Sequence, residues 1–192
     1  MVQKKDSVKT MVVVLTVTCM VAGICLSFTY NQTKDAIAQA ELDAQLRSVR
    51  TVLPPFDGEP EVITRVINGK EKTLYIGRKN GVIVGVAISS TSLGYGGTLK
   101  ILVGIRPDGT ITGIELLQHK ETPGLGAKAS SSDFLTQFKG KFLTQSTDEI
   151  KVKKDGGDID SITAATITSR AVAKAATTAL REFMQHKDEI LR

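Results

Sequence analysis

EVITRVINGKEKTLYIGRKNGVIVGVAISS, residues 61–90, is the stretch that decides the fold of this chain. It holds two Asn-Gly pairs, at 68–69 and 80–81, each flanked by residues rich in Val, Ile, Thr and Tyr. Asn-Gly suits the two-residue turn of a β-hairpin because both turn positions need a positive φ, and β-branched and aromatic side chains favour strands. The pattern predicts three consecutive antiparallel strands, over residues 61–67, 72–79 and 82–90.

The strand pattern resumes after a glycine-rich break at residues 94–97. Strands are predicted over residues 99–106 and 111–117, with Asp108-Gly109 as the turn between them. Consecutive strands without intervening helices indicate an antiparallel sheet rather than βαβ units. A loop over residues 118–129 is expected next. A short helix over residues 132–138 and a further strand over residues 149–153 should follow it.

A long helix is predicted from about Thr168 towards Leu191. Its apolar residues recur at helical spacing: Val172, Ala176, Leu180, Phe183 and Met184. That apolar face should cover the sheet. We therefore expect an α+β domain in which helices pack on an antiparallel sheet.

The run DSITAATIT, residues 160–168, lies just before this helix and is made of small, hydroxyl-bearing residues. Backbone N–H groups at a helix start have no partner within the helix and carry partial positive charge, so such a place suits a phosphate. A threonine there can also carry a phosphate as an ester. The plainer alternative is a helix cap, which Ser and Thr commonly form.

A second informative stretch is HKETPGLGAK, residues 119–128. Two glycines and a proline constrain this loop, and its backbone can approach a flat ligand closely. His119, Glu121 and Lys128 are ionisable, but no matched nucleophile or second acid accompanies them. No acid–base catalytic residue is therefore predicted.

The first apolar run, residues 11–28, contains no charged side chain, and with its edges it approaches the ~20 residues that span a bilayer. Lys4, Lys5 and Lys9 precede it, which favours a cytoplasmic amino terminus with the rest of the chain outside. A cleaved signal peptide is the alternative, but its apolar part is usually ~7–15 residues long and a small-x-small site should follow. We predict an uncleaved anchor in the bacterial inner membrane over residues 1–30, a connecting helix and linker over 31–60, and an extracytoplasmic domain over 61–192.

Charge and cysteine usage exclude several other classes of protein. The formal net charge is +5, but outside the amino terminus the charges are interspersed, and no basic surface with interleaved aromatics indicates nucleic-acid binding. Both cysteines, Cys19 and Cys25, lie inside the apolar run. The predicted external domain therefore has no disulfide and no cysteine ligand for a metal.

Residues 119–128 and 160–168 together resemble the FMN-binding domains of bacterial membrane redox pumps. The order D-x-x-[ST]-[GA]-A-T-x-[ST] resembles the flavinylation motif of that family, although Ala164 stands where glycine is usual. The upstream H-x-E-T-P-G-L-G is similar to a loop of the same domains, and Tyr95-Gly96-Gly97 is a weaker match. With the anchor, the chain looks like the G subunit of Rnf-type ion-translocating ferredoxin:NAD oxidoreductases, relatives of the C subunit of sodium-translocating NADH:quinone reductases.

This resemblance implies covalent FMN, joined through its phosphate to Thr166 by a flavin transferase. It implies an electron-transfer subunit of a redox-driven translocase, whose partners are other membrane and iron–sulfur subunits. Thr163 would be a partner hydroxyl, and Lys128 or Arg170 would add positive charge. The full set of cofactor-binding residues that it implies is Thr166, Thr163, Ala164, Ala165, Ser161, Glu121, Thr122, Gly124, Leu125, Gly126 and Lys128.

Two other functions stay open from the sequence. The same covalent flavin could serve another extracytoplasmic electron-transfer chain that pumps no ion. Alternatively, the chain could be a non-redox, membrane-anchored binding or assembly module in which Thr166 is only a cap. The coupling ion and the immediate electron donor and acceptor leave no recognisable pattern in the residues.

Overall fold

A computed structural model describes residues 8–144 and 148–191. Lys4 and Lys5, on which the predicted orientation partly depends, lie outside the described residues. The chain divides into two compact units, Met1–Ala44 and Gln45–Arg192. The three-part division at residues 30 and 60 stays a prediction.

A single helix, α1 (Val8–Val52), runs through the first unit and ends in the second. The helix is long and apolar enough to cross a membrane, and the side chains of its apolar segment are exposed. The helix expected after Tyr30 is present as the continuation of α1, which runs without a break to Val52.

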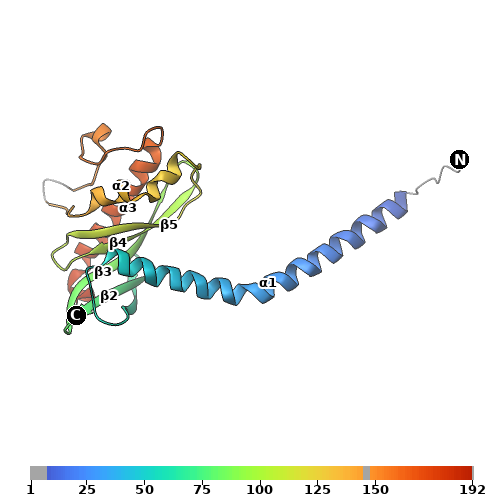
Figure 1. The fold of residues 1–192 in the computed structure, drawn as a ribbon, viewed down its shortest axis with the longest axis horizontal. Helices are drawn as coiled ribbons and strands as arrows, with labels where there is room; N and C mark the ends of the chain where they lie inside the picture. Colours follow the sequence, from blue (N-terminus) through green and yellow to red (C-terminus); the bar gives the residue numbers. More distant parts are fainter. Residues whose placement is uncertain (1–7, 145–147, 192) are drawn as a thin grey trace. The chain divides into compact units, whose positions relative to one another are not determined.

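Five strands form one antiparallel sheet in chain order (Figure 1): β1 (Glu61–Ile67), β2 (Lys70–Lys79), β3 (Val82–Leu93), β4 (Thr98–Ile105) and β5 (Ile111–Gln118). Both Asn-Gly pairs adopt the positive φ that the turn requires, with values of 51° and 73° at Asn68-Gly69 and 51° and 78° at Asn80-Gly81. Strand pairing closes directly on each side of both turns. The predicted meander is confirmed.

Helix α3 (Thr166–Gln185) packs across one face of the sheet, mainly on β3 and β4 (Figure 1). Val172, Leu180 and Phe183 are fully buried in the core that it shares with the strands, and the short α4 (Lys187–Ile190) follows it. Met184 is 46% exposed, so its expected place on the buried face is wrong. The α+β architecture is confirmed.

The last two turns of α1 pack on the opposite face of the sheet. Val49 and Val52 form a second apolar cluster with Tyr75, Ala87 and Leu102, whose side chains alternate with those facing α3. The Tyr75 hydroxyl donates to Oε1 of Gln45 at 2.9 Å, and burial raises the pKa of this tyrosine. Both faces of the sheet centre are therefore covered.

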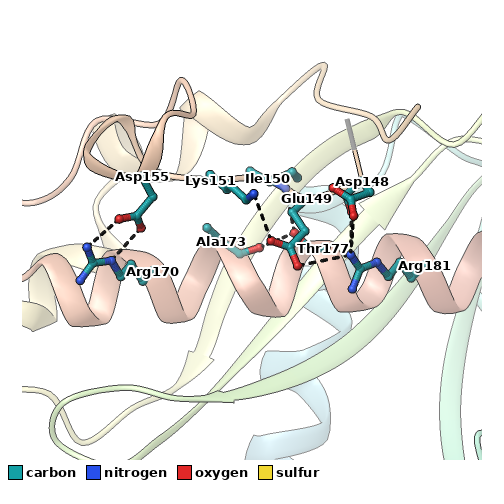
Figure 2. Close-up of polar contacts among 9 residues, drawn as sticks. All are labelled: Asp148, Glu149, Ile150, Lys151, Asp155, Arg170, Ala173, Thr177 and Arg181. Atoms are coloured by element: carbon teal, nitrogen blue, oxygen red, sulfur yellow. Dashed lines mark hydrogen bonds and ion pairs between the residues drawn. The ribbon is translucent and has the colours of Figure 1, made fainter. Parts of the chain in front are cut away.

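Short elements connect β5 to α3: η1 (Gly126–Ser130), α2 (Ser132–Leu135), η2 (Thr136–Phe138) and η3 (Lys153–Asp155). The strand expected over residues 149–153 is wrong, since only one isolated bridge forms there, between Val152 and Ile159. The reason is that the segment runs along α3, where the Ile150 N–H donates to Oγ1 of Thr177 at 3.0 Å (Figure 2).

Candidate functional site

A cavity of about 430 Å³ lies at the amino-terminal end of α3, within the range of ~300–1,000 Å³ usual for small-molecule sites. Two segments about forty residues apart in the sequence wall it, together with one residue from the loop after β3. The lining residues are Tyr95, Glu121, Thr122, Leu125, Gly126, Ala164, Ala165, Thr166, Ile167 and Thr168. The fold therefore brings the two segments singled out in the sequence together at one place.

Thr166 is the first residue of α3, two positions earlier than the predicted helix start. The N-cap is Ala165, no side chain caps the helix, and its first turn has no acidic residue. Thr166 therefore lies at the end of the helix where backbone N–H groups lack partners within the helix and where the helix dipole is positive. Such a helix start is suited to an anionic group.

The loop before Thr166 is held from two sides. The Asp160 N–H donates to Oε1 of Gln137 at 2.7 Å, and the Ile162 N–H donates to Oγ of Ser169 at 3.0 Å. Ala164 then takes a left-handed conformation with φ of 61°, which leads the chain into the helix. A residue with a Cβ is strained there, which is the physical reason that glycine is favoured at this position.

Glu121 is the buried centre of the site, with 6% of its surface exposed. Its Oε2 accepts from the Thr168 hydroxyl at 2.8 Å, and its Oε1 accepts from the Gly96 N–H at 3.1 Å. A Cβ on Gly94 or Gly126 would collide with this carboxylate. Those two glycines are required because the backbone approaches the carboxylate so closely.

One positively charged residue at the site, Lys154, was not indicated by the sequence motifs. The Lys154 ammonium donates to Oγ1 of Thr166 at 3.1 Å. Arg170 instead forms two hydrogen bonds with Asp155, at 2.7 and 2.6 Å. This contact lowers the pKa of Asp155 and raises that of Arg170. Lys128 is exposed and does not line the cavity.

Most of the residues expected at the cofactor site line this cavity, and four do not. Thr163, Gly124 and Lys128 are exposed outside it, and Ser161 has a buried hydroxyl for which no hydrogen-bond partner occurs among the described residues. Tyr95, Ile167 and Thr168 line the cavity without having been expected at the site. Tyr95 and Ile167 are largely exposed, so they form the rim of the cavity.

Residues 94–181 match the family model described as FMN-binding domain, and this span includes every residue that lines the cavity. The chain is 39% identical to the G subunit of the ion-translocating oxidoreductase complex of Vibrio atlanticus, over 90% of this chain and 88% of that protein. The chain belongs to this family of G subunits. It is also 35% identical to the G subunit of the proton-translocating ferredoxin:NAD(+) oxidoreductase complex of Clostridium ljungdahlii, over 88% of this chain and 87% of that one.

Two solved structures share the fold of this member of the G-subunit family. One is the C subunit of the Na(+)-translocating NADH-quinone reductase from Parabacteroides distasonis, with a TM-score of 0.52 and 27% identity. That match covers 61% of this chain and 63% of the other. The second is NqrC of Shewanella oneidensis, with a TM-score of 0.55, 20% identity, and coverage of 74% and 73%.

The residues at the cavity fit the FMN that membership of the G-subunit family implies. Half-apolar walls suit a flat ring system, since Leu125 and Ile167 join the hydroxyl groups of Thr122 and Thr166 in the lining. The open helix start and the Lys154 ammonium both favour a phosphate beside Thr166.

Proposed function

We propose that this chain is an electron-transfer subunit of a membrane ion-translocating oxidoreductase and that it carries FMN covalently bound to Thr166. The position of Thr166 supports this most directly. Its side chain lies in the first turn of α3 and borders the cavity that Glu121, Thr122, Leu125 and Gly126 also line. A cofactor esterified there through its phosphate can place its ring in that cavity.

Attachment as a phosphodiester needs an activated donor, because condensing a phosphate monoester with an alcohol would require the loss of water. In our proposal, Thr166 attacks the flavin-side phosphorus of a flavin dinucleotide. The Oγ–P bond forms, the P–O bond of the anhydride breaks, and the nucleoside monophosphate leaves with the bonding electron pair. The hydroxyl proton passes to a base.

This base must come from another protein. Lys154, whose ammonium donates to Oγ1 of Thr166, cannot accept a proton while it is charged. No carboxylate or imidazole contacts that oxygen among the residues that the structure describes. A dedicated flavin transferase therefore supplies the base and binds the donor.

Bound FMN supplies reversible electron transfer, and the chain supplies position and electrostatics. The open first turn of α3 favours the single negative charge of the phosphodiester by ~0.3–1 kcal/mol. The tether also removes the dependence of occupancy on free cofactor concentration, which matters outside the cytoplasm. No side chain of the site needs to act as an acid or a base.

α1 anchors the domain in the bacterial inner membrane with the amino terminus in the cytoplasm. Residues 11–28 contain no ionisable carboxylate or amine, so this helix is unsuited to carry the translocated ion by itself. Other membrane and iron–sulfur subunits of the complex supply the ion path and the remaining electron carriers.

Peptide mass spectrometry of the full chain, purified from membranes of its native host, tests the attachment. We expect the peptide containing Thr166 to carry the mass of FMN, less water. Thr166→Ala should abolish labelling and Thr166→Ser should retain part of it. Thr178→Ala is the matched control. The Thr178 hydroxyl lies about three turns further along the same helix and donates to the Lys174 carbonyl. A bare Thr166 peptide in native material would overturn the proposal.

Co-purification in mild detergent separates the proposed complex from an electron-transfer chain that pumps no ion. We expect the intact chain to bring down membrane and iron–sulfur subunits in fixed ratios. Recovery with only soluble redox partners would favour the alternative chain.

A further inference from the structure

A short turn beside the start of α3 presents a single lysine to Thr166. Lys154 is the middle residue of η3, and its ammonium lies 3.1 Å from Oγ1 of Thr166. This oxygen is the atom that the proposed function esterifies. A cation that touches it would also touch any phosphoryl group joined to it.

The two neighbours of Lys154 already have their charges compensated, whereas Lys154 does not. Lys153 pairs with Asp160 at 2.8 Å, and Asp155 pairs with Arg170 at 2.6 Å. In the part of the chain that the structure describes, no carboxylate lies within 4.0 Å of the Lys154 ammonium. The turn therefore offers one free positive charge, and that charge faces Thr166.

The segment over residues 148–157 holds this turn against α3. Figure 2 shows the segment running along the helix, with Asp155 facing Arg170 at one end and Asp148 and Glu149 facing Arg181 at the other. Between these ends, Ile150 donates to Thr177. These contacts join the segment to α3 at three points, so the turn is held in place without a ligand.

Backbone contacts close the turn itself. The Lys153 N–H donates to the Ile159 carbonyl at 2.8 Å, and the Gly157 N–H donates to the Val152 carbonyl at 3.1 Å. Gly156 ends the turn with a φ of 82°, a conformation that glycine adopts without strain. The position of the Lys154 backbone is thus set by the fold, and only its side chain has to be ordered.

We infer that Lys154 is the positioning residue for the phosphoryl group joined to Thr166, an inference that rests on the proposed function. Before attachment, its ammonium orients the threonine oxygen and attracts the anionic phosphate of the donor. After attachment, the same ammonium pairs with the negative charge of the phosphodiester. Arg170 is the weaker candidate, because its Nε and Nη2 already donate to Asp155 and its charge is paired.

The test compares four full-length chains: wild type, Lys154→Met, Lys154→Arg and Lys174→Met. Methionine keeps the unbranched stem of lysine without its terminal ammonium, and arginine keeps the charge. Lys174 is the matched control, an exposed lysine on α3 about 12 Å further along the helix axis than Thr166. Each chain is incubated with limiting flavin transferase and FAD, and labelling is followed by in-gel fluorescence.

We expect Lys154→Met to label about five-fold more slowly than wild type, the effect of losing one partly exposed charge contact. Added KCl should slow the wild type and Lys174→Met but leave Lys154→Met nearly unchanged. Lys154→Arg should recover most of the wild-type rate. Equal rates for wild type and Lys154→Met, or a defect in Lys154→Arg as large as that in Lys154→Met, would overturn the inference.

A second readout does not depend on the transferase reaction. Labelled and unlabelled chains are unfolded thermally, and the change in Tm on labelling is compared between variants. We expect labelling to raise the Tm of wild type by about 1–3 °C more than that of Lys154→Met. The same gain in both would overturn the role of Lys154 in the product. A wild type that accepts no flavin at Thr166 would overturn the proposed function itself, and the inference with it.

Discussion

The hydroxyl of Thr168 donates a 2.8 Å hydrogen bond to Oε2 of Glu121, forty-seven residues earlier in the chain. The other oxygen of the same carboxylate accepts from the Gly96 N–H. One buried side chain thus joins the first turn of α3, the loop after β5 and the loop after β3. These are the three segments that wall the cavity, so its shape depends on this carboxylate.

Replacing Glu121 tests that dependence. Glu121→Ala leaves the Thr168 hydroxyl and the Gly96 N–H without their acceptor, so we expect a loss of about 1–3 kcal/mol in the free energy of unfolding. Glu121→Gln keeps one acceptor oxygen and should lose less than half as much. Urea unfolding of the detergent-solubilised chain, followed by circular dichroism, measures both. Glu71→Ala, at an exposed glutamate, is the control. If Glu121→Ala lost no more unfolding free energy than Glu71→Ala, the structural role of Glu121 would be contradicted.

Thr168→Val tests the pair rather than the single residue. Valine keeps the shape of threonine and removes the hydroxyl, so the carboxylate loses one partner. In a double-mutant cycle with Glu121→Ala, which removes both acceptor oxygens, we expect a coupling of about 1 kcal/mol, because the two side chains share one contact. Additive losses would mean that the hydrogen bond adds nothing beyond the two side chains taken separately.

The sheet could be predicted from the sequence because its signals are local. Asn68-Gly69 and Asn80-Gly81 each place two residues at positive φ, and this requirement alone sets the turn and the register on both sides. The strand expected over residues 149–153 failed for the opposite reason. Its alternation resembles a strand, but its pairing depends on Thr177, which lies on a helix more than twenty residues away.

The cavity was partly predictable in the same sense. Motif spacing indicated which two loops belong together, but it carries no information on the directions of side chains. Lys128 and Arg170 were plausible cations from the sequence, yet Lys154 is the one that contacts Thr166. Its place follows from a turn held by distant ion pairs, which no local pattern contains.

Ala164 has a left-handed backbone, which is costly for a residue with a Cβ. Ala164→Gly should relieve about 1–2 kcal/mol of strain, offset by about 0.4–1 kcal/mol of extra freedom in the unfolded chain. We expect a net gain in the free energy of unfolding of up to about 1.6 kcal/mol, measured by urea unfolding. Ala127→Gly, at a residue without positive φ, should lose stability instead. A loss in both variants would contradict the strain at Ala164.

Asp155 gives the segment along α3 a dependence on pH. Two hydrogen bonds from the Arg170 guanidinium lower the pKa of this carboxyl. A carboxyl with a lowered pKa in the folded state adds stability above its unfolded pKa of about 3.9, and this stability disappears as the pH falls through the folded pKa. Asp155→Asn should therefore lower Tm slightly at pH 7, and the difference from wild type should vanish at an acidic pH below the folded pKa.

The exposed Asp133→Asn serves as the control for this pH series. Its Tm should follow that of wild type at both pH values. A difference between Asp155→Asn and wild type that grew on acidification would contradict the lowered pKa, because the sign of the linkage would then be reversed.

The orientation of α1 in the membrane can be tested with fusions at the carboxyl terminus. The basic residues before the apolar run favour a cytoplasmic amino terminus, and residues 11–28 carry no charge that would oppose insertion. Alkaline phosphatase, which needs an oxidising compartment to form its disulfides, should be active when it is fused after Arg192. A fluorescent protein that folds only in the cytoplasm should stay dark at the same position.

Changing Lys4, Lys5 and Lys9 to Gln should weaken the preference for a cytoplasmic amino terminus, whereas Lys34→Gln, on the other side of the apolar run, should not. A silent phosphatase with a bright fluorescent fusion would place Thr166 in the cytoplasm, where covalent retention of FMN would have no advantage.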